Sequence, residues 1–276
     1  MNINRQAAVI KRAQATAHQK ESKMKITAPK LIPWAGLAAM VAGILFVVIQ
    51  PIHPPDVSAS VTTAQWAIVH YLGVAMCLFG LLGLAGLYAR QVEAAGWLGL
   101  AGYLLLSLFY ALTMAFQFAE AFISPRLATE SPRFVEGFLG IFNGHPGEVD
   151  LGEVDLGALP AVYGLTGGAY LLGGLVFGIA TLRAGILPRW AAGLLAVAAP
   201  VAPVAVALLP HALERYAAVP MGIALAGLGY ALWSERRERF NPSALASLST
   251  NPDEDVSTGV HQPTVVPSNG HVASKV

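Results

Sequence analysis

The fold is decided first by an uncharged stretch of twenty residues, Leu31-Ile-Pro-Trp-Ala-Gly-Leu-Ala-Ala-Met-Val-Ala-Gly-Ile-Leu-Phe-Val-Val-Ile-Gln50. A helix of about 20 apolar residues is long enough to cross the ~30 Å hydrocarbon core of a bilayer. Five further apolar stretches follow, at residues 64–89, 96–122, 159–181, 190–209 and 216–233. The sequence therefore predicts an all-α, polytopic membrane protein with six transmembrane helices.

The composition of the whole chain agrees with a membrane location. Of its 276 residues, 55% are hydrophobic and only 12% are charged, whereas a typical soluble domain has about 25% charged residues. The net charge of +1 argues against a nucleic-acid-binding protein, which needs a concentrated basic face. The single cysteine, Cys77, excludes an internal disulfide. We expect the lipid bilayer as the main partner, no nucleic acid and no cofactor.

The distribution of basic residues predicts the orientation. If the N-terminus is cytoplasmic, fourteen of the seventeen Lys and Arg residues fall on the cytoplasmic side. Only Arg126, Arg133 and Arg215 then fall on the outer side. Basic residues accumulate in the cytoplasmic segments of membrane proteins. The pattern predicts a multi-pass protein of the plasma membrane with both termini in the cytoplasm.

The regions outside the apolar stretches differ in character. Residues 1–30 form a basic cytoplasmic tail, and residues 31–236 form the membrane domain. Within that domain, residues 123–158 are predicted to form a long acidic outer loop. The loop contains Glu148-Val-Asp-Leu-Gly152 twice in succession, which is most simply a replication slip tolerated in an exposed segment. Residues 237–276 are rich in polar residues and proline and are predicted to be a disordered cytoplasmic tail.

The apolar stretches also resemble one another in pairs. The odd-numbered helices begin with tryptophan and small residues, and the even-numbered helices end near arginine: Trp34, Trp97 and Trp190, and Arg90, Arg183 and Arg236. This pattern is typical of three helical hairpins of like orientation, as in membrane folds with parallel repeats. The alternative is shared composition alone, because Trp favours the membrane interface and Arg favours the cytoplasmic side.

Ionisable and polar residues within or beside a membrane span are costly and are the first place to look for function. By the predicted topology they gather on the outer side: His53, His70, Gln117, Glu120, His145 and His211. Imidazole and carboxylate groups suit Zn²⁺ or a proton relay. The alternative is hydrogen bonding between helices, and no His-Glu-x-x-His motif decides between these interpretations.

Glycines spaced three or four apart form stripes of small residues along the second, third and fourth predicted helices. They are Gly80, Gly83 and Gly86, then Gly96, Gly99 and Gly102, and finally Gly174 and Gly178. Small residues allow membrane helices to approach closely. The stripes predict helix packing, either within one subunit or with a second copy or another membrane protein.

Four stretches carry a resemblance to a known group of proteins. They are Pro33-Trp-Ala-Gly-Leu-Ala-Ala, Phe118-Ala-Glu-Ala-Phe, Val135-Glu-Gly-Phe-Leu-Gly-Ile-Phe and Gly185-Ile-Leu-Pro-Arg-Trp-Ala-Ala-Gly. Over residues 31–236 the chain resembles bacterial six-helix integral membrane proteins of unknown function. The resemblance implies a prokaryotic plasma membrane and supplies no catalytic residue.

Three classes of function fit the sequence. A non-enzymatic accessory or regulatory membrane protein fits best, because almost no charged residue is predicted near the bilayer centre. A small-solute or proton-coupled transporter is the first alternative, for which the proline pair Pro200 and Pro203 is the only helix-breaking feature near the middle of a span. An intramembrane metal-dependent enzyme using the outer histidines and Glu120 is the second.

Overall fold

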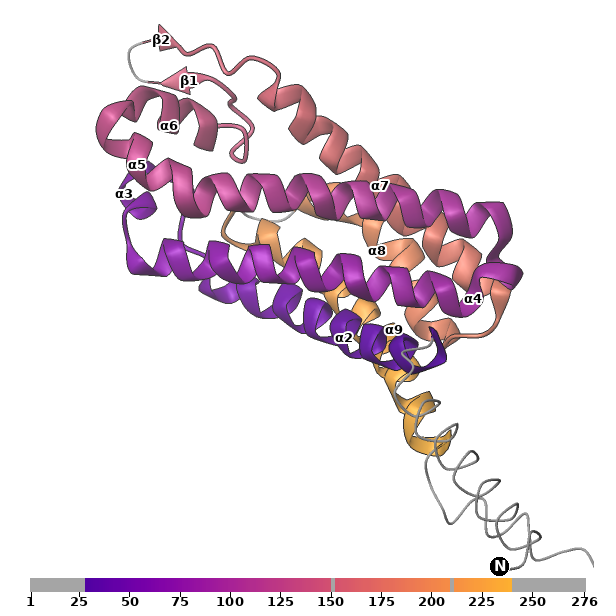
Figure 1. The fold of residues 1–276 in the computed structure, drawn as a ribbon. Coiled ribbons are helices and arrows are strands. Elements are labelled where there is room, and N and C mark those ends of the chain that lie inside the picture. The colour runs from indigo at the N-terminus through magenta and orange to yellow at the C-terminus, as the bar shows by residue number, and fades with distance from the viewer. Residues whose placement is uncertain (1–27, 150–151, 209–210, 240–276) are drawn as a thin grey trace, which may run out of the picture. The chain divides into compact units, whose positions relative to one another are not determined.

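The chain divides into two units, Met1–Arg237 and Glu238–Val276, and almost all of the structure described below belongs to the first. Nearly all of the predicted N-terminal and C-terminal tails lies outside the described residues. The computed structural model describes residues 28–149, 152–208 and 211–239 (Figure 1).

The described part of the chain is mostly helical. In order, its elements are α2 (Ala28–Ile52), α3 (Ser58–Val61), α4 (Ala64–Phe118), the π-helical turn η1 (Ala119–Ile123), α5 (Ser124–Glu130), α6 (Pro132–Leu139), strands β1 (Glu148–Val149) and β2 (Gly152–Glu153), α7 (Leu159–Ala184), α8 (Arg189–Leu208), the 3₁₀-helix η2 (His211–Ala218) and α9 (Val219–Arg239).

Within these residues, four helical stretches are long and apolar enough to cross a membrane. They are Leu31–Ile52, Ala64–Glu130, Leu159–Ala184 and Leu213–Glu235. A fifth apolar helix, Arg189–Ala205, is shorter. The predicted location in a membrane thus agrees with the length and composition of the helices.

The longest stretch is a helical hairpin, because α4 reverses direction at Gly96. The φ of Gly96 is +56°, a left-handed conformation that only glycine adopts at little cost. Residues before and after it meet: the rings of Tyr88 and Tyr103 stack at 4.9 Å, and Nε1 of Trp66 donates to the carbonyl oxygen of Glu120 at 2.9 Å. The two halves of α4 therefore run side by side in opposite directions (Figure 1).

The turn of this hairpin is tighter than the sequence predicted. Residues 90–95 were expected to connect two helices, but they continue the first helix up to Gly96. The segment Arg90-Gln-Val-Glu-Ala-Ala95 contains no proline or glycine, and most of its residues are good helix formers. The reversal therefore takes place at one residue.

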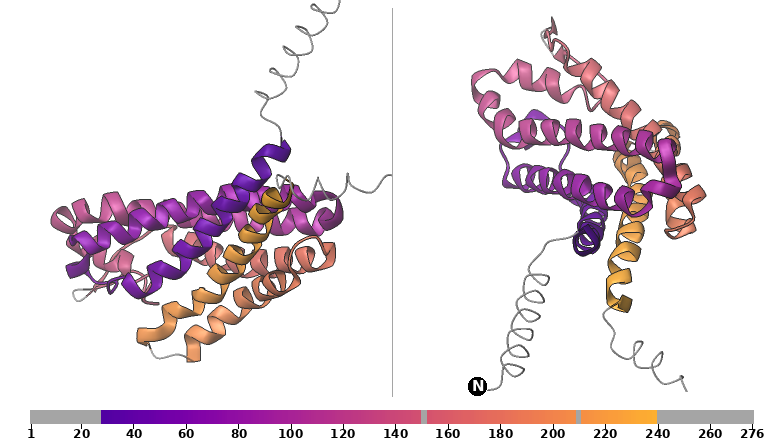
Figure 2. Two further views of the ribbon diagram at one scale, coloured as in Figure 1. Left: turned by 90° about the horizontal axis from the view of Figure 1, so that it is seen from below. Right: turned by 45° about the vertical axis from the view of Figure 1, so that its right-hand side comes forward.

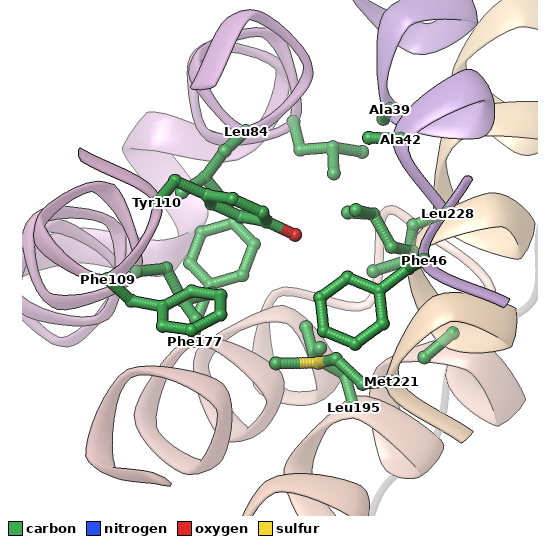
Figure 3. Close-up of a cluster of buried hydrophobic side chains, with 14 of the residues drawn as sticks. Ala39, Ala42, Phe46, Leu84, Phe109, Tyr110, Phe177, Leu195, Met221 and Leu228 are labelled. Carbon is green, nitrogen blue, oxygen red and sulfur yellow. The ribbon is translucent and has the colours of Figure 1, made fainter. Parts of the chain in front are cut away.

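The main hydrophobic core lies between the α4 hairpin, α2, α7, α8 and α9. Figure 3 shows how side chains from all five helices converge, with the hydroxyl of Tyr110 directed into the cluster. The labelled members are Ala39, Ala42, Phe46, Leu84, Phe109, Tyr110, Phe177, Leu195, Met221 and Leu228. Burial of these side chains, together with close backbone approach at glycines, holds the helices together.

Most of the glycines predicted to pack helices lie against a neighbouring segment. A Cβ on Gly83 would lie 2.5 Å from the Cα of Ala39, and one on Gly178 would lie 2.5 Å from the backbone nitrogen of Ala196. Atoms of other residues likewise occupy the space beside Gly80, Gly86, Gly99, Gly102 and Gly174. Gly96 corrects the prediction, because it has no neighbour within 4 Å and forms the turn instead.

A second set of glycines, which the stripes did not include, joins α2 to α9. A Cβ on Gly36 would lie 2.7 Å from the backbone nitrogen of Trp233, and one on Gly222 would lie 2.8 Å from the carbonyl oxygen of Gly43. The two helices lie side by side (Figure 2). The first and last described helices thus close the bundle through backbone contact.

The segment predicted as a long acidic outer loop, residues 123–158, is largely structured. It contains α5, α6 and the β1–β2 hairpin. Val135 and Leu139 of α6 pack against Trp66, while Phe138 packs against Phe116. Apolar residues three and four apart give α6 a buried face, and that face covers the end of the α4 hairpin opposite the turn at Gly96.

The duplicated Glu-Val-Asp-Leu-Gly sequence spans the β hairpin. Glu148 of the first copy stands opposite Glu153 of the second, and Val149 stands opposite Gly152. Downstream in the second copy, Leu156 is buried in the cluster with Phe138. The second copy therefore extends into a packed core.

The close contact at Gly83 predicts an effect on stability. We expect Gly83→Ala to lower the free energy of unfolding by about 1–3 kcal/mol, because the added methyl group meets the backbone of α2 and forces the helices apart. Thermal unfolding of the detergent-purified protein, followed by reaction of the buried Cys77 with a thiol-reactive fluorophore, measures the change.

The same substitution at Gly164 is the matched control, since nothing lies within 4 Å of its added Cβ. Alanine should there leave stability unchanged or raise it, because it favours helix more than glycine does. Equal unfolding temperatures for the two variants would contradict the packing role of Gly83.

Candidate functional site

The site begins at the N-terminal end of α4, where the helix start fixes two aromatic rings. Thr63 caps the helix, its hydroxyl oxygen accepting a hydrogen bond from the backbone N–H of Trp66 at 3.2 Å. Trp66 is fully buried. Four residues later, on the same face of the helix, the ring of His70 packs on that of Trp66 with 4.2 Å between centroids.

The partner of His70 comes from the other half of the hairpin, where one turn is π-helical. This turn, Ala119–Ile123, carries Glu120, which is 3% exposed. π-Helical turns insert an extra residue and are frequent at functional sites. One helical turn earlier, Gln117 Nε2 donates to Oε2 of Glu120 at 3.4 Å.

His70 and Glu120 form a buried pair. Nε2 of His70 lies 3.3 Å from Oε2 of Glu120, and both side chains are shielded from solvent. The other ring nitrogen, Nδ1, lies 2.7 Å from the carbonyl oxygen of Trp66. Because a carbonyl oxygen can only accept, Nδ1 carries a proton. At 3.3 Å, Nε2 and the carboxylate oxygen are close enough to form an ion pair when the imidazole is protonated.

His53 extends the cluster from the loop after α2. The helix ends at Ile52 because Pro54 and Pro55 cannot donate backbone hydrogen bonds. The ring of His53 lies edge-on to that of His70, with 5.2 Å between centroids. Its Nδ1 donates to the carbonyl oxygen of Pro54 at 2.6 Å, so this imidazole is held in place by its own loop.

An ion pair fixes that loop against η2. Arg215 Nη2 lies 3.4 Å from Oδ2 of Asp56, and Nη1 donates to the carbonyl oxygen of His53 at 3.3 Å. Asn143 also donates to the carbonyl oxygen of Asp56, at 2.9 Å. Segments far apart in the sequence are thereby joined beside the His70–Glu120 pair.

These groups surround a cavity of about 370 Å³. We call it the outer pocket, because it lies at the end of the bundle that the sequence predicts to face outward. Its polar lining comes from Gln50, His53, Asp56, Gln117, Glu120, Asn143, Glu214 and Arg215, and its apolar lining from Phe46, Ile49, Gly73, Met76, Phe142 and Tyr163. The volume lies at the small end of the ~300–1,000 Å³ range of ligand sites. The outer pocket therefore combines an apolar wall with charged and hydrogen-bonding groups, as small-molecule sites do.

The structure brings four of the six candidate residues together. His53, His70, Gln117 and Glu120 belong to the cluster described above. His145 does not, because its exposed side chain lines a neighbouring hollow with Glu136 and Glu148. His211 begins η2, and its side chain lies outside the described part of the structure.

Several residues of the site were missed by sequence reasoning. Asp56 and Arg215 form the ion pair over the pocket, and Trp66 bonds to both members of the buried pair. The sequence feature that could have identified Asp56 as a site residue is its position three residues after His53. The signal for Trp66 was its position one helical turn before His70, on the same helix face.

Among residues 28–149, 152–208 and 211–239, no group of three or more His, Cys, Asp or Glu side chains could hold a metal ion. The cluster does place an imidazole beside a carboxyl group, and such a pair can exchange a proton.

No family model, curated protein or solved structure matched this chain. The function is therefore inferred from the site itself.

Burial of His53 predicts a pH dependence of stability. Burial lowers the pKa of His53, and the nearby Arg215 acts in the same direction, whereas Asp56 opposes it. The unfolded chain therefore binds more protons than the folded protein below the ordinary value of 6.5. The free energy of unfolding should fall as the pH falls through and below 6.5, towards the lowered pKa of the folded state.

We expect His53→Asn to remove part of this decline, measured as the unfolding temperature in detergent between about pH 5 and pH 7. His145→Asn, which changes an exposed side chain, is the matched control and should keep the full decline. An unchanged pH profile in the His53 variant would show that His53 is not responsible.

Proposed function

We propose that this chain is a plasma-membrane protein with six membrane crossings, cytoplasmic termini and a solute-binding function at its outer face. The solute is small and polar, and it occupies the outer pocket. The observation that carries the proposal is the buried His70–Glu120 pair, whose carboxylate lines that pocket.

Contacts at both ends of the bundle support six crossings. At the end predicted to be cytoplasmic, Arg90 Nε lies 2.9 Å from Oε2 of Glu235, and Gln91 donates to the hydroxyl of Thr181 at 2.9 Å. The opposite end carries the outer pocket. This division is expected if α2, the two halves of α4, α7, α8 and α9 each cross once, with α8 the shortest apolar helix.

The energetics of the site support binding. An ionisable pair in an apolar interior costs free energy unless it is matched by hydrogen bonds, and Glu120 is 3% exposed while His70 is fully buried. Hydrogen bonding between helices accounts for the pair but not for the cavity that Glu120 lines. A binding site accounts for both, because polar groups in surroundings of low dielectric constant interact with a ligand more strongly than the same groups in water.

From the sequence alone, an accessory protein fitted best, but the outer pocket favours a different class of function. A transporter or solute receptor accounts for the outer pocket, whereas an accessory protein accounts only for the glycine faces. The feature that first suggested transport was the proline pair of α8. Pro200 and Pro203 lie inside a continuous helix and do not line the outer pocket, so the proposal does not depend on them.

Water access to the outer pocket can be measured without knowing the ligand. In a Cys77→Ala background, we expect Gln50→Cys to react with a membrane-impermeant charged thiol reagent added to intact cells. Gln50 lines the outer pocket, and a charged reagent needs an aqueous route to reach it. The labelled fraction of the purified protein gives the result.

Two further cysteines complete the design. Val48→Cys lies two residues away on the exposed face of α2, which should face lipid, and it should stay unlabelled. Glu93→Cys, near the turn of the α4 hairpin, should label only after the cells are permeabilised. The proposal is wrong if Gln50→Cys is protected in intact cells, or if Glu93→Cys labels without permeabilisation.

A further inference from the structure

Resting on the solute-binding function proposed above, we infer that the outer pocket takes a small organic cation and that binding releases the proton shared by His70 and Glu120. The positions of the two side chains, the charges around the pocket and the aromatic groups that line it support this ligand class and its coupling to a proton.

The pair is asymmetric with respect to the outer pocket. Glu120 lines the cavity, whereas His70 is not among its lining residues and lies behind the carboxylate. The carboxylate can therefore meet a ligand, while the imidazole holds the proton on the buried side. Gln117 donates to the same carboxylate oxygen that faces His70, which favours an ionised carboxylate and a protonated imidazole in the empty pocket.

The charges facing the outer pocket favour a cation. Its lining contains three carboxylates, Asp56, Glu120 and Glu214, and one guanidinium, that of Arg215. The guanidinium is paired with Asp56. Burial lowers the pKa of His53, so this ring adds no positive charge at neutral pH. A cationic ligand would be attracted by this lining, and an anion would be repelled.

The apolar lining favours an organic cation over a hydrated metal ion. Phe46, Phe142 and Tyr163 contribute aromatic rings to the outer pocket. Aromatic faces attract quaternary and protonated amines through cation–π interactions, and such cations give up their hydration readily. The combination of aromatic rings with carboxylates is therefore suited to a substituted ammonium group.

Charge balance links the ligand to the proton. In the empty pocket, protonated His70 neutralises the carboxylate of Glu120. A cation beside that carboxylate takes over this role, and a second positive charge in the same buried place would be repelled. The Nε2 proton therefore leaves to bulk water as the cation arrives, and the total charge of the site stays constant. No covalent bond other than N–H changes.

The titratable and charged groups around Glu120 come from four different parts of the chain. They are His53 and Asp56 from the loop after α2, His70 from α4, Tyr163 from α7, and Glu214 and Arg215 from η2. Because the bound cation competes with a proton, its affinity should rise with pH while the pair still holds that proton.

The test uses tetramethylammonium chloride as the probe, because this ion neither donates nor accepts a proton. Isothermal titration of the detergent-purified full-length protein, repeated in buffers of different ionisation enthalpy, measures affinity and proton release together. We expect release of about one proton per bound cation near neutral pH. tert-Butanol, which has nearly the same shape without the charge, should bind at least about tenfold more weakly and release no proton.

Variants test which residues are needed for cation binding and proton release. Glu120→Gln should lose both cation binding and proton release, whereas Glu136→Gln, in the neighbouring hollow, should behave as the unmodified protein. If Glu120→Gln does not fold, Tyr163→Leu serves instead, since loss of the ring should weaken binding by about tenfold or less while the proton count stays the same. Unchanged cation binding in both variants would overturn the assignment.

Titration of the unmodified protein also tests the inference without any variant. Equal binding of tert-butanol, binding of tetramethylammonium without proton release, or no binding of the cation would each overturn the inference. Each of these results, combined with labelling of Gln50→Cys from outside, would leave the solute-binding function standing and reject only the cation. Protection of Gln50→Cys would instead reject the pocket itself.

Discussion

The register of the α4 hairpin is the constraint on which the site depends. With the reversal fixed at Gly96, side chains of the second half fill the spaces that glycines leave in the first. Gln117 occupies the space beside Gly73, and Tyr110 that beside Gly80. A shift of the two halves by one residue would turn these side chains away from the glycines. The same register brings Glu120 against His70, so helix packing and site geometry have one cause.

That register also explains how an ionisable pair is tolerated in an apolar bundle. Trp66 accepts from His70 through its carbonyl oxygen and donates through its indole to the backbone of Glu120. Gln117 adds a donor to the carboxylate. The desolvation cost of a buried pair is offset only when such hydrogen bonds are in place. Removing one member would leave the other buried without its counterpart, which is the more costly condition.

Much of the fold could be predicted from the apolar stretches, because their length is set by the thickness of a bilayer. The positions of the helix ends were less predictable. Residues 90–95 carry polar side chains that indicate a loop, yet they have the helix propensity to continue α4. The amphipathic face of α6 was difficult to predict, because Val135, Phe138 and Leu139 lie in a segment rich in acidic residues, and such a composition is typical of an exposed loop.

Only part of the candidate site could be predicted from the sequence. His70, Gln117 and Glu120 stood out because polar residues are rare within apolar stretches. Asp56 and Arg215 did not, since charged residues are ordinary in loops, and only tertiary contact makes them part of the outer pocket. His145 illustrates the reverse case, a histidine of the expected chemistry that folds onto an exposed surface.

The outer pocket can bind a solute through its hydrogen-bonding lining and through the carboxylate of Glu120, and these two parts of the site affect its selectivity differently. Hydrogen-bonding groups such as Gln50 and Asn143 line the outer pocket and can bind any polar solute of fitting size. The carboxylate of Glu120 discriminates by charge, and it does so through a partner that the solute does not reach. A neutral solute leaves the proton on His70 and gains hydrogen bonds alone. A cation gains the carboxylate as well, but only by displacing that proton, so its binding energy includes the cost of deprotonating the imidazole. Discrimination between the two classes therefore depends on pH, even though neither the shape nor the hydrogen-bond donors of the pocket need change.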